Sequence, residues 1–270
     1  MTDYKNIKIS DAFNHGKAMI AFVTGGDPDL ETTEKLLPAM QKAGADLIEI
    51  GIPFSDPIAE GPVIQDANER ALAKGCTTDH LFDMVKRVRE SGKVTVPMVF
   101  LTYANPIYTY GKERFMSKCQ ECGINGVIVP DIPFEEKEEF LPEATKYGVD
   151  IISMIAPTSD ERIIKIAKEA TGFLYVVSSL GVTGVRTQIT SDIGSMIELV
   201  RKASDIPAAV GFGISTPEQA KKMAETSDGS IVGSAIVKIV AKYGKDCIPY
   251  VQEYIRSLNE AIKGTEKISA

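Results

Sequence analysis

Residues 46–65 read DLIEIGIPFSDPIAEGPVIQ, and the predicted fold and chemistry are built around this stretch. Residues 46–50 are expected to form a short buried strand, because apolar residues lie on both of its faces. Glu49 interrupts this apolar run, and a carboxylate is rarely placed in a buried strand unless it has a partner or a function. Desolvation is expected to raise the pKa of Glu49 toward the range in which a carboxyl group can both donate and accept a proton.

A proline-rich loop follows this strand and carries two further acids, Asp56 and Glu60. Glu49 at the end of the strand and Glu60 on the loop can face one pocket. A purely structural alternative is that Glu49 pairs with a lysine or caps a helix, and this segment alone does not separate the two interpretations. The rest of the chain is needed to choose between them.

Composition narrows the class of protein. The chain has 270 residues, of which 44% are hydrophobic and 25% charged, which is typical of a globular protein with a sizeable core. A net charge of −7 argues against nucleic acid or an anionic membrane as the main partner. No apolar run approaches the ~20 residues of a membrane span, and the first residues lack the apolar core of a signal peptide. We therefore expect a cytoplasmic protein.

The cysteines and histidines give little indication of a metal site. Cys119-x-x-Cys122 lies in an expected helix, with no second cysteine pair and no histidine nearby. Ordinary reduced thiols are the preferred interpretation, although a metal or redox site is the alternative. His15 and His80 are the only histidines, and His80 is expected to be solvated because it follows a helix-start signal. We expect no metal and no cofactor.

Strand and helix patterns alternate about eight times along the chain, without a linker or a shift in composition. A short amphipathic helix over 3–13 is expected to plug one end of the fold. Helices are expected up to Gly44 and over 63–74, 79–91, 112–122, 135–147, 191–203 and 246–262, with capped helix starts at Thr158-x-x-Glu161 and Thr216. Strands are expected over 19–24, 46–50, 96–102, 126–129, 150–155, 173–178, 208–211 and 230–232.

Eight such units in ~250 residues predict an α/β fold, a single (β/α)₈ TIM barrel domain that spans residues 1–270. A doubly wound open sheet is the alternative, but it would normally carry a Gly-x-Gly-x-x-Gly turn after its first strand. Gly25-Gly26-Asp27-Pro28 is not such a turn. In a barrel the active site lies at the C-terminal ends of the strands, which is where Glu49 is expected.

Glycine-bearing segments follow the last three expected strands and predict a phosphate site. In barrels, the loops after strands seven and eight and the N-terminus of a short extra helix commonly bind phosphate. Glycine lets backbone N–H groups approach the anion, and the helix dipole favours negative charge there. The segments are Gly181-Val-Thr-Gly184, Gly211-Phe-Gly213-Ile-Ser215 and Gly233-Ser234-Ala235, the last of which opens a stretch short enough to be such a helix.

The chemistry available to this barrel is limited. None of the expected strands contains a lysine, which disfavours a Schiff-base aldolase, and the two histidines are far apart and neither is at a strand end, which disfavours a zinc-dependent aldolase or a metal-dependent epimerase. Carboxylates must then handle a phosphate-bearing substrate by proton transfer. This pattern favours an isomerase, or a lyase whose substrate carries its own electron sink.

Several motifs resemble those of the tryptophan synthase alpha subunit family, over nearly the whole chain. The most specific is residues 49–65, from Glu49 to Gln65. The others are Phe22-Val-Thr-Gly-Gly-Asp-Pro28, Tyr103-Ala-Asn105, Val129-Pro-Asp131, Ala156-Pro-Thr158, Gly181-Val-Thr-Gly184, Gly211-Phe-Gly213 and Val232-Gly-Ser-Ala-Ile-Val237. The resemblance implies a lyase that cleaves indole-3-glycerol phosphate to indole and glyceraldehyde 3-phosphate in tryptophan biosynthesis.

The resemblance also implies roles for individual residues. Glu49 would protonate the indole ring at C3 and then help to remove the proton of the glycerol hydroxyl, and Glu60 would bind the indole N–H. Tyr175 would assist near Glu49. The remaining binding residues would be Phe22 and Phe212 in the indole pocket, Thr183 closing over the site, and Gly184, Gly213, Gly233 and Ser234 at the phosphate. The family works with a pyridoxal-phosphate beta subunit in an α₂β₂ complex, and the loops 53–62 and 178–190 would couple the two subunits.

Two positions depart from the family pattern. Relatives usually carry aspartate where this chain has Glu60, and Ser179 also stands where relatives often differ. The extra methylene moves the carboxylate by ~1.5 Å, and a misplacement of that order can cost about a hundredfold in rate. Either the loop is set back to suit the longer side chain, or isolated activity is poor. The alternatives to the coupled lyase are a stand-alone lyase, a phosphosugar isomerase or epimerase, and a non-catalytic barrel that binds and activates the beta subunit.

Overall fold

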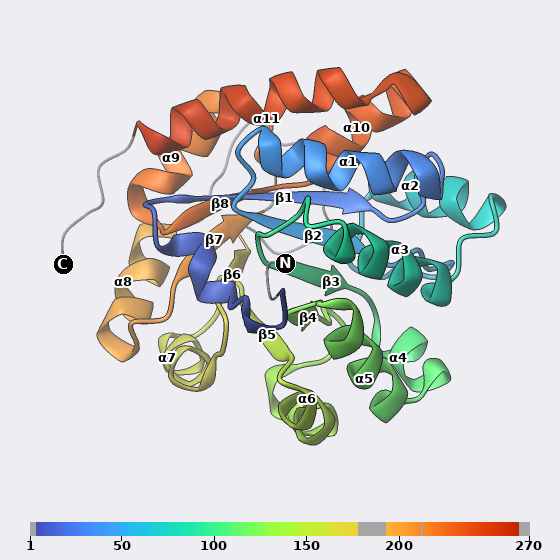
Figure 1. The fold of residues 1–270 in the computed structure, drawn as a ribbon. Helices are drawn as coiled ribbons and strands as arrows, with labels where there is room; N and C mark the ends of the chain where they lie inside the picture. Colours follow the sequence, from blue (N-terminus) through green and yellow to red (C-terminus); the bar gives the residue numbers. More distant parts are fainter. Residues whose placement is uncertain (1–3, 178–192, 212, 265–270) are drawn as a thin grey trace.

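Eight parallel strands close into a barrel, with helices covering its outer surface (Figure 1). The computed structural model describes residues 4–177, 193–211 and 213–264. The predicted (β/α)₈ fold is confirmed. The strands are β1 (Ala18–Thr24), β2 (Leu47–Gly51), β3 (Met98–Leu101), β4 (Gly126–Ile128), β5 (Asp150–Ile155), β6 (Leu174–Val177), β7 (Ala208–Gly211) and β8 (Gly229–Val232).

Most expected helices form, with boundaries that differ by one or two residues. Their amphipathic faces pack on the outside of the strands, where apolar residues from both layers form the larger core. The described helices are α1 (Leu30–Lys42), α2 (Pro62–Ala73), α3 (Thr78–Glu90), α4 (Ala104–Tyr110), α5 (Lys112–Cys122), α6 (Leu141–Tyr147), α7 (Asp160–Glu169), α8 (Ile193–Ala203), α9 (Pro217–Thr226), α10 (Ser234–Tyr243) and α11 (Ile248–Lys263). None of them is long and apolar enough to cross a membrane.

Three local predictions need correction. Helix α4 was not expected, because Pro106 suggests a loop; proline is tolerated in the first helical turn, whose N–H groups have no partner within the helix. The helix expected over 135–147 is divided into a 3-10 helix (Phe134–Glu139) and α6. Helix α7 is preceded by Ser159 as its N-cap, so the capping box expected from Thr158 is wrong. The capping box at Thr216 is confirmed.

The N-terminal end of the barrel is filled by apolar side chains. Ile9, Ala12 and Phe13 are buried against the inward-facing residues of the strands, and the Phe13 and Phe173 rings lie 6.1 Å apart. The plug consists of two short 3-10 helices (Tyr4–Asn6 and Ile9–Phe13) rather than one amphipathic helix. Because this end is closed, the opposite end is where the barrel interior can receive a ligand.

A buried arginine fixes the plug to the barrel wall. Arg89 on α3 is 2% exposed and donates hydrogen bonds to the carbonyl oxygens of Gly123, Val94 and Val96 and to the Asn125 side chain. The Asn125 amide in turn donates to the Ile7 carbonyl at 2.8 Å. Burial lowers the pKa of Arg89 to about 10. Hydrogen bonds to four acceptors compensate for the loss of hydration of this cation.

Candidate active site

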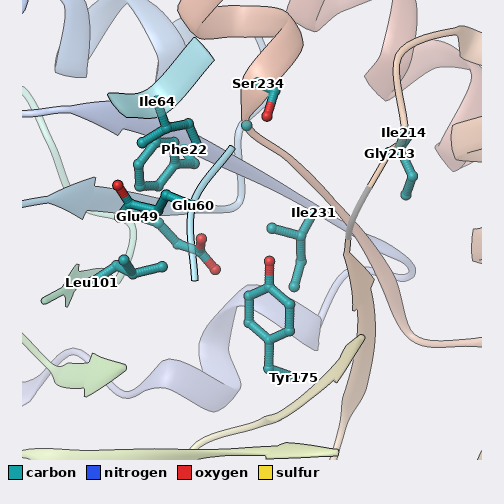
Figure 2. Close-up of a pocket in the computed structure, with 11 residues that line it drawn as sticks. Phe22, Glu49, Glu60, Ile64, Leu101, Tyr175, Gly213, Ile214, Ile231 and Ser234 are labelled. Atoms are coloured by element: carbon teal, nitrogen blue, oxygen red, sulfur yellow. The ribbon is translucent and has the colours of Figure 1, made fainter. Parts of the chain in front are cut away.

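A pocket opens at the C-terminal ends of the strands (Figure 2). It encloses about 510 Å³, part of it open to solvent, which is within the range of small-molecule sites. Seven of the ten residues predicted from the sequence line it. Its described lining consists of Phe22, Glu49, Glu60, Ile64, Leu101, Tyr175, Gly213, Ile214, Ile231, Gly233 and Ser234.

Glu49 is placed in the pocket by the register of β2. It lies between Phe22 of β1 and Val99 of β3, and its position shares the inward-facing side of β2 with Leu47 of the barrel core. The residue is only 1% exposed, and burial raises the pKa of Glu49 to about 8. Its Oε1 atom has no hydrogen-bond partner among the described residues. The carboxyl group is therefore mostly protonated at neutral pH and is suited to donate a proton.

Tyr175 of β6 lines the same pocket from the other side of the barrel. It is 6% exposed. Burial, and to a smaller extent the negative charge of Glu49, raises the pKa of Tyr175 well above its ordinary value. The phenol therefore stays neutral and offers a hydroxyl group near the Glu49 carboxyl.

Glu60 is buried where the loop meets α2. It is 5% exposed, and its Oε2 accepts a hydrogen bond from Asn68 Nδ2 at 2.7 Å. The Tyr103 hydroxyl also hydrogen-bonds this carboxylate. Burial raises the pKa of Glu60, whereas these two hydrogen bonds oppose that rise. The longer side chain at this position therefore has its own partners, on α2 and beyond the end of β3.

The two carboxyl groups have different surroundings. Glu49 is buried with no described group that stabilises its anion, whereas two donors stabilise the anion of Glu60. Pairs of carboxyl groups whose environments separate their pKa values are typical of sites that use one as an acid and the other as an anion.

Apolar side chains form flat walls around the carboxyl groups. Phe22 packs against two glycines: a Cβ at Gly51 would lie 2.8 Å from the ring, and one at Gly233 would lie 3.2 Å from it. Ile64, Leu101 and Ile231 complete the walls, and none of the three was predicted from the sequence. The inward alternation of β3 and β8 is the signal that could have identified Leu101 and Ile231. Such apolar walls suit an apolar or aromatic group of a ligand.

The part of the pocket lined by Gly233 and Ser234, next to Phe22, has the features of an anion site. Gly233 is the N-cap residue of α10, and Ser234 is its first residue. The unpaired N–H groups and the dipole of a helix N-terminus favour a negative charge. Gly213 also lines the pocket and has φ of 82°, a conformation that favours glycine. Helix α10 has ten residues, so the expectation of a short helix after β8 is wrong in length.

Three of the predicted residues lie outside the described part of the chain. These are Thr183, Gly184 and Phe212, so their assignments stay predictions. The same holds for Ser179 and the loop 178–190. Cys119 and Cys122 are free thiols, both buried, and burial raises their pKa values. In the ranges that the structure describes, no group of three histidine, cysteine or acidic side chains is arranged to hold a metal ion.

Comparison with known proteins identifies the family. The family model described as tryptophan synthase alpha chain matches residues 10–265. The chain belongs to the tryptophan synthase alpha chain family. The alpha chain of Lactiplantibacillus plantarum is 46% identical over 265 residues, which cover 98% of this chain and 97% of that protein. The alpha chain of Lacticaseibacillus casei is 44% identical over 262 residues, covering 97% of this chain and 98% of that protein.

Solved structures agree with the sequence comparison. The alpha subunit structure from Legionella pneumophila has a TM-score of 0.84 at 36% identity, covering 94% of this chain and 97% of that chain. A chain of the Mycobacterium tuberculosis tryptophan synthase structure has a TM-score of 0.85 at 30% identity, covering 95% and 98%. The protein is accordingly a carbon–carbon lyase of tryptophan biosynthesis, and it cleaves indole-3-glycerol phosphate.

The raised pKa of Glu49 predicts how stability depends on pH. Between its ordinary pKa of 4.5 and about 8, the folded chain retains a proton at Glu49 that the unfolded chain has released. Folding stability contributed by this group is therefore complete below pH 4.5 and is lost as pH rises toward 8. The Glu49→Gln variant lacks this loss and should be more stable than the parent by about 2–4 kcal/mol at pH 7.5, but by less than about 1 kcal/mol at pH 5.

Urea unfolding at both pH values measures this difference. Glu69→Gln is the matched control, because Glu69 is an exposed glutamate on α2. Its neutralisation should not appreciably change the free energy of unfolding at either pH. Equal stability of Glu49→Gln and the parent at both pH values would contradict a neutral, desolvated Glu49.

Proposed function

We propose that Glu49 is the general acid and base of the cleavage. Its protonated carboxyl group transfers a proton to C3 of the indole ring, which places a positive charge at the ring nitrogen. The resulting carboxylate then takes the proton of the hydroxyl on the adjacent side-chain carbon. That carbon becomes the aldehyde of glyceraldehyde 3-phosphate, while the electrons of the breaking C–C bond return to the ring and neutralise the nitrogen. Glu49 is protonated again at the end of the reaction.

Glu60 is assigned to the indole nitrogen. As an anion, it accepts the ring N–H and stabilises the positive charge that develops there when C3 is protonated. Such stabilisation is stronger in the transition state than in the ground state, so it should raise kcat rather than only tighten binding. Tyr175 is assigned an assisting role beside Glu49, where its hydroxyl group can hydrogen-bond the substrate hydroxyl or the carboxylate.

The remaining residues are assigned to substrate binding. Phe22 supports the indole ring from within the pocket, together with Phe212, and Thr183 closes over the site. The phosphate group is assigned to the glycine-rich side. Its residues are Gly184, Gly213, Gly233 and Ser234.

The single observation that carries this assignment is the burial of Glu49. A carboxyl group with a pKa of about 8 is protonated at neutral pH and lies close enough to neutrality to change its state during turnover. It shares one pocket with a second carboxyl group, that of Glu60, which accepts a hydrogen bond from Asn68, and with the apolar side chain of Phe22 and a helix N-terminus. Glu49 supplies the acid, and the other three features match the charged nitrogen, the indole ring and the phosphate group of the substrate.

Replacement of Glu49 by glutamine tests the assignment. An amide of the same shape preserves the pocket but cannot transfer a proton, so Glu49→Gln should lower kcat for cleavage by at least about a thousandfold. The Kd for indole-3-propanol phosphate, which lacks the reacting hydroxyl, should change by less than about threefold. Activity is measured as indole release and affinity by calorimetry, with Glu69→Gln as the control for neutralisation of a glutamate. Residual turnover above one tenth of the parent would remove Glu49 from this role.

We also propose that this chain assembles with a beta subunit that carries pyridoxal phosphate, in an α₂β₂ complex that passes indole between the subunits. The similar chain from M. tuberculosis comes from a structure of tryptophan synthase. Ile58, on the loop beside the pocket, is 71% exposed, and Tyr108 on α4 is 46% exposed. Exposed apolar and aromatic side chains suit a protein partner, and Ile58 is close in sequence to Glu60 of the pocket. Residues 1–270 are proposed to form one domain, and a cytoplasmic location stays a prediction.

Indole release with and without a beta subunit tests the partnership. Addition of the subunit should raise the rate at least about tenfold, and Ile58→Asp should reduce that stimulation because it places a charge in the proposed contact. Tyr250→Asp, which alters an exposed aromatic residue of α11, is the matched control. Fast release that does not respond to the subunit would instead indicate a stand-alone lyase.

A further inference from the structure

Tyr103 connects the loop between β2 and α2, which carries Glu60, to the end of β3. Its backbone is the N-cap position of α4, and its ring packs on Phe54 with the centroids 5.4 Å apart. The hydroxyl oxygen accepts a hydrogen bond from the Ala59 N–H at 3.2 Å. The same hydroxyl hydrogen-bonds the Glu60 carboxylate. One buried hydroxyl therefore fixes both the backbone before Glu60 and the side chain of Glu60.

Asn68 holds the carboxylate from the other element that borders the loop. It lies on α2, is 3% exposed, and donates from Nδ2 to Glu60 Oε2 at 2.7 Å. The same helix also holds the backbone, because Gln65 Nε2 donates to the Glu60 carbonyl at 2.6 Å. The carboxylate is thus held by side chains from two separate elements rather than by the loop itself.

Helix α2 is in turn fixed to the loop that follows β1. Arg70 forms a two-pronged ion pair with the buried carboxylate of Asp27, with N–O distances of 2.8 and 2.9 Å. Bidentate pairs of this kind restrict orientation as well as position. The donor of Asn68 therefore has a defined place relative to β1 and β2, which carry Phe22 and Glu49.

We propose that Asn68 and Tyr103 are positioning residues, which direct the Glu60 carboxylate toward the ring nitrogen of the substrate and adapt this pocket to a glutamate at position 60. The proposal rests on the proposed function of Glu60 as the acceptor of the indole N–H. It adds two residues that do not line the pocket themselves and that act through Glu60.

The charges around Glu60 explain why it needs these partners. The other titratable groups in the described lining of the pocket are Glu49 on β2 and Tyr175 on β6, and no lysine or arginine belongs to that lining. Asp131, which accepts the Ala104 N–H, adds negative charge near Tyr103. Burial raises the pKa of Glu60, and the hydrogen bonds from Asn68 and Tyr103 lower it. Without them a larger fraction of Glu60 would be protonated and unable to stabilise a positive nitrogen.

The hydrogen bond from Asn68 also depends on the length of the side chain at position 60. Shortening Glu60 to aspartate withdraws the carboxylate by ~1.5 Å, which is one C–C bond length. The hydrogen bond from Asn68 is 2.7 Å long, so withdrawal of the carboxylate by that amount would break it unless α2 or the loop moved. A glutamate is therefore the residue that these two donors accommodate.

A double-mutant cycle in the full-length chain tests the proposal. Tyr103→Phe and Asn68→Leu are each made in the parent and in Glu60→Gln, and kcat, KM and pH profiles for indole release are measured. In the parent, each change should lower kcat about 10–100-fold with KM changed less than threefold, and should move the acidic limb of the kcat profile upward by about one pH unit. In Glu60→Gln, each should lower kcat by less than about threefold, because the group through which they act is no longer an anion.

Tyr110→Phe is the matched control, because it removes another tyrosine hydroxyl that is bonded to a carboxylate, that of Asp79, outside the pocket. Its kinetic constants should stay within twofold of the parent. Tyr103→Phe removes one oxygen and keeps the ring on Phe54, so it provides a folded variant even if Asn68→Leu is unstable. The proposal would be overturned if Tyr103→Phe and Asn68→Leu lowered kcat by the same factor in Glu60→Gln as in the parent and did not shift the acidic limb. Tyr103 and Asn68 would then have a merely structural role. Parent-like activity of Glu60→Gln would instead overturn the function proposed for Glu60 itself.

Discussion

The chemistry proposed for this protein depends on the removal of one carboxyl group from water. Glu49 is 1% exposed inside a closed ring of strands, and no described side chain supplies a charge that would stabilise its anion. Desolvation of this kind disfavours the charged form and raises the pKa of a carboxyl group. The same group in water would be ionised at neutral pH and could not protonate an indole ring.

The rest of the fold provides this environment at one end only. The plug and the buried Arg89 close the N-terminal end, while the loops and helix termini at the other end surround the pocket. Glu60 lies a short distance along the chain from Glu49 and is nearly as buried, yet it has two hydrogen-bond donors. The difference between the Glu49 carboxyl group, whose Oε1 has no described partner, and the hydrogen-bonded carboxyl group of Glu60 therefore follows from neighbours supplied by α2 and by Tyr103 beyond the end of β3. The assigned steps require neither a metal nor a lysine.

Much of the fold could be predicted from the sequence because its pattern is strongly periodic. Helix α5 and strands β5 and β7 have the expected bounds, and the other strands differ from expectation by one or two residues at an end. Helix α4 was missed because Pro106 falls in its first turn, where proline is tolerated. The plug was expected as one helix, but residues 7 and 8 separate two short turns that insert Ile9 and Phe13 into the barrel.

The site was predictable where a residue breaks a pattern, and less so where it continues one. Glu49 stands out because it interrupts an apolar strand, and the glycines stand out because they follow strand ends. Leu101 and Ile231 continue the apolar pattern of their strands, so the alternation shows that they face inward but does not separate pocket residues from core residues. Asn68 and Tyr103 become recognisable only when the fold brings α2 and the end of β3 against Glu60.

The ionisation of Glu49 is the most direct test of this account. The chain can be labelled with ¹³C at the glutamate carboxyl carbons and titrated by NMR, and the Glu49 signal is assigned by its absence in Glu49→Gln. The account predicts a carboxyl group that remains protonated at pH 7 and titrates with a midpoint of about 8. A midpoint near the ordinary value of 4.5 would contradict it, because Glu49 would then be an anion throughout the physiological range and could not be the acid that starts the cleavage.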